Sequence, residues 1–165
     1  MKITFRKAKP SDMARWFKVL NKLISEKKAP FINKTDPLTK KEIENRAQQI
    51  AKGESLSFIA KINGKIIAQV GMQKYKGRTA HRVHMGWFVD PDYWNKGVMS
   101  QLLKYTLKEL KKLGFKRAEC EIVPLNKASI RVVEKAGFKR EGIKKKAFRL
   151  DSGKYVDIYI YGRLI

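Results

Sequence analysis

Residues 89–110, VDPDYWNKGVMSQLLKYTLKEL, run from the end of an apolar strand into an amphipathic helix. Leucines at 102, 103, 107 and 110 share one face of this helix, lysines take the other, and Gly114 ends it. Between strand and helix, residues 93–100 hold one glycine, one lysine and one serine. A strand that turns directly into a helix leaves unpaired N–H groups and the positive end of the helix dipole facing outward. The loop is therefore either a plain turn or a phosphate cradle, by which we mean a loop whose N–H groups hold a phosphate.

The segments around this stretch predict a chain of alternating strands and helices. Asn63-Gly64 between two apolar runs is a strong hairpin signal. We expect Ser11 or Asp12 to cap the first helix, and Thr39 with Glu42 matches a capping box before the second. The predicted strands are 3–8, 56–62, 66–72, 82–89, 115–123, 138–149 and 154–163, and the predicted helices are 10–23, 39–52, 98–113 and 126–136.

Strand–helix–strand passages at 83–123 and 116–145 favour a sheet that is partly parallel. The predicted fold class is α/β (α+β), with a mixed central sheet of about six to seven strands and helices on both faces. The length of 165 residues favours one domain over 1–165.

Charge is the unusual feature of the composition. Lys and Arg number 38 against 15 Asp and Glu, which gives a net charge of +23 and favours polyanionic partners such as nucleic acid or the ribosome. No apolar run reaches the length of a membrane span, and the first residues lack the apolar core of a signal peptide. The single cysteine, Cys120, excludes an internal disulfide and alternates with apolar neighbours as a core residue. We expect a cytoplasmic protein without a metal site.

A second motif, residues 126–138 (NKASIRVVEKAGF), reads by itself as a helix capped by Asn126 and stopped by Gly137. Together with residues 89–103 it resembles the GNAT N-acetyltransferase superfamily, and the order of elements matches over essentially the whole chain. The C-terminal pattern at 151–157 and the Tyr93-Trp94 pair are most similar to the branch of ribosomal-protein N-terminal acetyltransferases and their small-amine relatives.

The resemblance implies acetyl-coenzyme A as the cosubstrate. The family's pyrophosphate loop, Arg/Gln-x-x-Gly-x-Gly/Ala, falls on residues 94–99, where Gly97 is kept, Trp94 replaces the first residue and Met99 fills the second small position. The Met99 side chain would either crowd the phosphates or turn into the core. The implied cofactor-binding residues are Phe88, Val89, Trp94, Asn95, Lys96, Gly97, Val98, Met99, Ser100, Asn126 and Ser129.

The resemblance also implies a proton donor and a base. Many members carry a tyrosine where this chain has Val133, so Ser129, or a water that it holds, is the candidate substitute, with Tyr155 and Tyr159 as alternatives. The alternative for Ser129 is that it only caps or packs. His84 stands where relatives often have a glutamate, and Glu119 and Glu121 lie on one face of the next strand. For each of these three the alternative is a surface contact or pairing with a lysine. We expect His81 to be a surface residue.

The leading hypothesis is an N-acetyltransferase that transfers the acetyl group directly to a primary amine in a ternary complex. We expect the acceptor to be a protein N-terminus or lysine, since a +23 protein repels polyamines, while a small neutral or anionic amine stays open. The alternative is a non-catalytic polyanion-binding module on the same fold, supported by the departures at Trp94, Met99 and Val133. The oligomeric state, a homodimer included, is left open.

Overall fold

The computed structural model describes residues 2–165, and its seven strands form one sheet in the order β1-β2-β3-β4-β5-β7-β6. The strands are β1 (Thr4–Lys7), β2 (Ser55–Ile62), β3 (Lys65–Lys74), β4 (Arg82–Val89), β5 (Arg117–Ile122), β6 (Lys139–Arg149) and β7 (Tyr155–Leu164). Neighbouring strands are antiparallel except β4 and β5, which are parallel. The predicted element order and the mixed sheet are confirmed.

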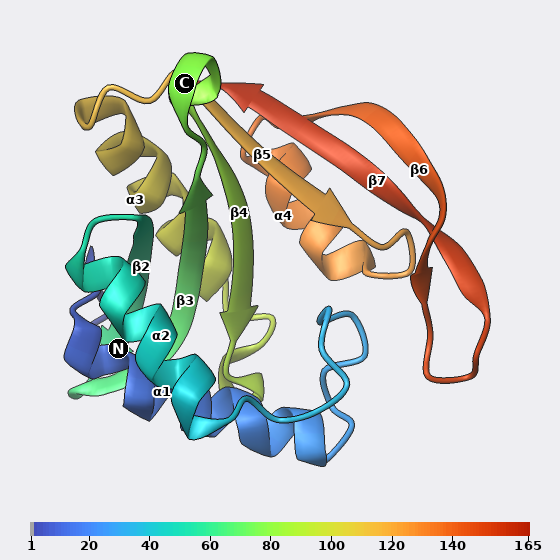
Figure 1. The fold of residues 1–165 in the computed structure, drawn as a ribbon, viewed down its shortest axis with the longest axis horizontal. Helices are drawn as coiled ribbons and strands as arrows, with labels where there is room; N and C mark the ends of the chain where they lie inside the picture. Colours follow the sequence, from blue (N-terminus) through green and yellow to red (C-terminus); the bar gives the residue numbers. More distant parts are fainter. Residues whose placement is uncertain (1) are drawn as a thin grey trace.

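Four α-helices lie on the two faces of the sheet: α1 (Pro10–Ser25), α2 (Lys40–Ala51), α3 (Val98–Lys112) and α4 (Lys127–Lys135). The helices α1 and α2 pack against one face, and α3 and α4 lie behind the sheet on the other (Figure 1). Two short 3-10 turns, η1 (Gly77–Thr79) and η2 (Pro91–Tyr93), stand before and after β4. Within residues 2–165, no helix is long and apolar enough to cross a membrane.

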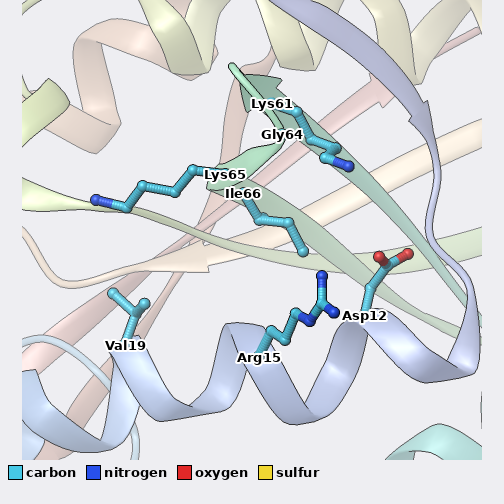
Figure 2. Close-up of a pocket in the computed structure, with 7 residues that line it drawn as sticks. All are labelled: Asp12, Arg15, Val19, Lys61, Gly64, Lys65 and Ile66. Carbon is cyan, nitrogen blue, oxygen red and sulfur yellow. The ribbon is translucent and has the colours of Figure 1, made fainter.

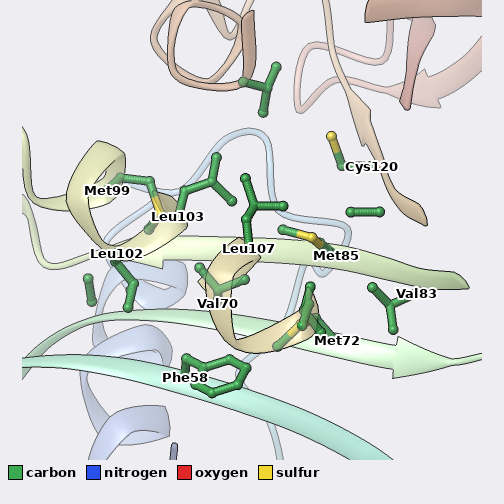
Figure 3. Close-up of a cluster of buried hydrophobic side chains, with 14 of the residues drawn as sticks. Phe58, Val70, Met72, Val83, Met85, Met99, Leu102, Leu103, Leu107 and Cys120 are labelled. Carbon is green, nitrogen blue, oxygen red and sulfur yellow. The ribbon is translucent and has the colours of Figure 1, made fainter. Parts of the chain in front are cut away.

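The larger core lies between the sheet and α3 (Figure 3). The predicted leucine face of α3 is confirmed, because Leu102, Leu103 and Leu110 are completely buried. Burying a leucine side chain stabilises a fold by about 2 kcal/mol. These contacts fix α3 against β2, β3 and β4, and so they also fix the loop that precedes it.

The helix caps agree only partly with prediction. Thr39 and Glu42 form the predicted capping box, in which the Thr39 hydroxyl accepts from the Glu42 N–H at 3.2 Å. The prediction that Ser11 or Asp12 is the N-cap of the first helix is wrong, because α1 begins at Pro10 and its N-cap is Lys9. Asp12 instead lies in the first turn, where its carboxylate accepts the Lys9 N–H at 2.7 Å and pairs with Arg6. Proline suits the first helical position because it has no N–H to leave unpaired.

The parallel pairing between β4 and β5 is short. It joins residues 82–84 to residues 117–119 and then stops, although β4 continues to Val89 and β5 to Ile122. Each strand stays paired with its antiparallel neighbour, β4 with β3 up to Val89 and β5 with β7 up to Ile122. The two halves of the sheet therefore diverge, as Figure 1 shows for β4 and β5, and the facing edges of residues 85–89 and 120–122 are left without a strand partner.

Candidate functional site

Asp90 anchors the start of the loop that joins β4 to α3. This aspartate is buried, its carboxylate forms an ion pair with Lys65 at 2.8 Å, and it accepts the Asp92 N–H at 3.1 Å. Trp94 folds back over the loop and donates its indole N–H to the Val89 carbonyl at 2.9 Å. Residues 90–94 of the loop are thus anchored before the helix begins. The anchoring role of Asp90 is not evident from the sequence, because Lys65 lies 25 positions away.

The start of α3 presents free N–H groups. Gly97 is the N-cap in the left-handed conformation (φ 69°), Asn95 is also left-handed (φ 58°), and no side chain caps the helix. Within residues 2–165, no acceptor takes a hydrogen bond from the N–H groups of residues 95–100. Unpaired N–H groups at the positive end of a helix dipole bind anions. This geometry is what a pyrophosphate requires.

Two predicted cofactor residues have clear side-chain positions. Met99 is 6% exposed and packs beside Leu102 and Leu103 in the core (Figure 3), so of the two expected positions the side chain takes the inward one. Lys96 donates from Nζ to the Asp92 carbonyl at 2.8 Å and lies 5.3 Å from the centre of the Tyr93 ring. Its positive charge therefore stays on the loop, next to the free N–H groups.

The unpaired, diverging edges of residues 85–89 and 120–122 border a region here called the gap, and Ser129 and Asn126 lie across it from β4. The Asn126 side chain accepts the Ser129 N–H at 3.1 Å, which confirms Asn126 as the N-cap of α4. Trp87 of β4 donates its indole N–H to the Ser129 hydroxyl oxygen at 3.2 Å. This contact joins the two halves of the sheet beyond the last strand pair, His84–Glu119, toward the carboxyl end of β4. Sequence reasoning missed Trp87, which occupies the same sheet face as the buried Val83 and Met85.

His84 and Glu119 lie on the opposite face. They are register partners in β4 and β5, at the last pair before the strands diverge. Glu119 is 9% exposed and accepts from Arg117 Nε at 2.6 Å and from Arg82 Nη1 at 3.0 Å. Burial raises the pKa of the Glu119 carboxyl, but the hydrogen bonds from Arg117 and Arg82 outweigh it and hold the pKa below the usual 4.5. Glu119 is therefore ionised and already paired, whereas His84 has no ion-pair partner within residues 2–165.

The remaining candidate site residues are spread over β4, β5 and β7. Glu121 forms an ion pair with Lys144 of β6. Tyr159 lies in β7 opposite Ile122, with the Arg140 guanidinium 4.6 Å from the centre of its ring. Tyr155 is 60% exposed at the far end of the β6–β7 hairpin. Phe88 packs edge-on against Trp16 of α1, with 5.2 Å between ring centroids, so its side chain lies on the His84 face.

Cys120 is core, as predicted, at 1% exposure, and burial raises the pKa of its thiol to about 12. Among residues 2–165, no cluster of three or more His, Cys, Asp or Glu could bind a metal ion. A pocket of about 190 Å³ lies between α1 and the β2–β3 turn, lined by residues that include Arg15, Lys61 and Lys65 (Figure 2). None of its lining residues belongs to β4, β5 or α4, so this pocket is separate from the gap.

Comparison with known proteins assigns the chain to a family. The model of the acetyltransferase (GNAT) domain matches residues 2–139, and the chain belongs to this family. The L-amino acid N-acetyltransferase AaaT of Escherichia coli is 31% identical over 109 residues, which cover 65% of this chain and 67% of that protein. Three other curated N-acetyltransferases, from Bacillus subtilis and Schizosaccharomyces pombe, are matched over only 43% to 64% of their own lengths.

Solved structures agree over the whole fold. The GNAT-family acetyltransferase of Streptococcus pneumoniae superposes with a TM-score of 0.87 at 27% identity, covering 99% of this chain and 100% of that one. A phosphinothricin acetyltransferase of Sinorhizobium meliloti, solved with acetyl-coenzyme A, superposes with a TM-score of 0.86 at 20% identity, covering 100% of this chain and 89% of that one.

Proposed function

We propose that this protein is an acetyl-coenzyme A-dependent N-acetyltransferase that transfers the acetyl group directly to a primary amine. The observation that carries the proposal is the divergence of β4 from β5, which ends at a loop with free N–H groups at residues 95–100. The free strand edges suit the amides of a pantetheine arm, and the loop suits a pyrophosphate. The inward position of Met99 leaves the loop clear for it.

The two sides of the gap offer the two proton-handling groups that the reaction needs. As the amine attacks the thioester carbonyl, the C–N bond forms and the C–S bond breaks, so the ammonium must lose a proton and the sulfur must gain one. His84 lies on one face of the sheet, and we assign it as the base that accepts the amine proton, directly or through water. Glu119 and Glu121 are weaker candidates because arginine and lysine occupy their oxygens.

Ser129 lies on the other face, with α4. Because the Trp87 N–H already binds the Ser129 oxygen, the hydroxyl proton is free to point elsewhere. We assign Ser129 to donate a hydrogen bond to the departing sulfur, with solvent supplying the proton. Trp87 is then a positioning residue that holds the serine at the gap.

The charges on the His84 face favour a protein N-terminus as the acceptor. On strands β5 and β6 three carboxylates lie on this face, at Glu119, Glu121 and Glu141, and each is paired with Arg82, Arg117 or Lys144. These six side chains pair with one another, so none of them offers a free carboxylate to the second ammonium of a polyamine or a free cation to the carboxylate of a free amino acid. The amine of a peptide N-terminus is flanked by a neutral amide, which fits this balance. A lysine side chain is the next candidate.

Two measurements test the proposal. Calorimetry should detect acetyl-coenzyme A binding, and thiol release should be followed with a panel of peptide N-termini, lysine peptides, polyamines and free amino acids, the last because AaaT is named for them. We expect His84→Ala to lower kcat at least tenfold while cofactor affinity stays the same, and His81→Ala, an exposed control, to change neither. Binding without thiol release on any acceptor would favour the non-catalytic module, and absence of binding would refute the proposal.

A further inference from the structure

The outer surface of the α3–α4 layer carries two rows of unpaired cations. Lys104, Lys108 and Lys111 are exposed along α3, and Lys127, Arg131 and Lys135 are exposed along α4. The spacing of three or four residues places each row on one helix face, with about 6 Å between the Cβ atoms of residues four apart. The two helices are in contact on the same side of the sheet, and the two rows together are here called the α3–α4 surface.

Ion pairs are more frequent in the other helical layer than on this surface. In the α1–α2 layer, carboxylates pair with several of the cations, as in Lys22–Glu26, Lys34–Glu42 and Lys40–Glu44, although Lys18, Lys41 and Lys52 are unpaired in the part of the chain that the structure describes. In residues 2–165, none of the six cations of the α3–α4 surface has a carboxylate within 4.0 Å. Unpaired cations in a regular array concentrate positive potential and attract a polymer of repeating negative charge.

We propose that the α3–α4 surface binds the phosphodiester backbone of nucleic acid. The large hydrophobic residues exposed next to it, Leu113 and Leu125, follow α3 and precede α4, so the rows themselves lack the apolar face with which helices enter lipid. Within residues 104–135 no aromatic side chain is exposed to stack on bases, so the contacts are to phosphates and are independent of base sequence. His84 lies on the opposite face of the sheet, and bound nucleic acid leaves that face open.

The test compares two triple variants that lose equal charge. Lys104→Ala, Lys108→Ala and Lys111→Ala together remove the α3 row, while Lys18→Ala, Lys41→Ala and Lys52→Ala remove three exposed, unpaired lysines from or next to the α1–α2 layer. Fluorescence anisotropy measures binding of 20-base-pair RNA and DNA duplexes from 50 to 200 mM salt. With about six phosphate contacts the native protein should lose about 10³-fold in affinity over this range.

We expect the α3-row variant to bind at least tenfold more weakly at 50 mM salt, and the slope of log affinity against log salt to become shallower by about 2.7. The control variant should keep the native slope, and both should keep native acetyl-coenzyme A affinity, which separates this result from failure of the proposed enzyme function. A second variant, with Arg131→Ala and Lys135→Ala, should flatten the slope by about 1.8. Equal losses in the two triple variants, no binding at 50 mM salt, or equally strong binding of polyglutamate would overturn the proposal.

Discussion

Gly97 is the residue at which a plain turn and a phosphate cradle make different predictions. It is left-handed (φ 69°), and a Cβ added there would meet only Gln101 Nε2, at 4.0 Å. Gly114, just beyond the other end of α3, is also left-handed (φ 85°), and a Cβ there would meet nothing within 4 Å. Alanine at either position should therefore lower the free energy of unfolding only through the strain of the left-handed backbone, by about 1–2 kcal/mol. In a protein of this size that lowers Tm by about 2–8 °C.

The two variants should differ in cofactor binding alone. A methyl group at Gly97 stands at the free N–H groups of α3, where a phosphate would approach, whereas Gly114 is a helix length away. Losing one charge-assisted hydrogen bond costs about 1.5–3 kcal/mol, so Gly97→Ala should weaken acetyl-coenzyme A binding about 10- to 100-fold, and Gly114→Ala should leave it unchanged. Thermal unfolding and calorimetry measure the two quantities. If both variants lose equal stability and Gly97→Ala keeps native affinity, the loop is a turn and the cradle is refuted.

Three further predictions concern single side chains. Trp87→Phe removes the N–H that binds Ser129, so we expect kcat to fall about fivefold, as for Ser129→Ala. The double variant should show no further loss of kcat, and additive losses in the double variant would contradict the coupling of the two residues. Glu119→Gln should lower the free energy of unfolding in urea by about 2 kcal/mol, because it leaves the part-buried Arg82 without a carboxylate and leaves Arg117 with Glu141 alone. Since the folded pKa of Glu119 lies below 4.5, its contribution is complete above about pH 4.5 and is lost as pH falls through the folded pKa, so the variant should lose less stability than the native protein on acidification. Cys120, with its pKa raised to about 12, should resist iodoacetamide at pH 8 in the folded protein, and rapid labelling would show that the core opens.

Signals that act within a few residues were readable from the sequence. Asn63-Gly64 predicts a hairpin because both residues tolerate positive φ, and the structure has φ 46° and 80° there. The leucine spacing gave the buried face of α3. The same spacing extends back to Met99, three residues before Leu102, and extending the pattern by one turn would have placed Met99 in the core.

Contacts between distant segments were not readable. Trp87 and Ser129 are 42 residues apart, and Arg82 and Glu119 are 37 apart. Whether they meet depends on where β4 stops pairing with β5, which is set by the packing of both strands against their other neighbours. Period-two alternation placed Glu119 and Glu121 correctly on one face. It could not indicate that Arg82 and Arg117 occupy the Glu119 oxygens, which makes Glu119 a weaker candidate for the base than His84.

The position of Val133 now has a physical context. Ser129 and Val133 are one helical turn apart on α4, and Val133 is completely buried and has no proton to donate. The group that faces the gap is the hydroxyl one turn earlier, and its orientation comes from Trp87 on β4 rather than from α4 itself. A hydrogen-bond donor positioned this way depends on the distance between the two diverging halves of the sheet. Activity should therefore respond to Trp87→Phe even though that change leaves α4 intact, whereas a donor carried by α4 alone would not respond.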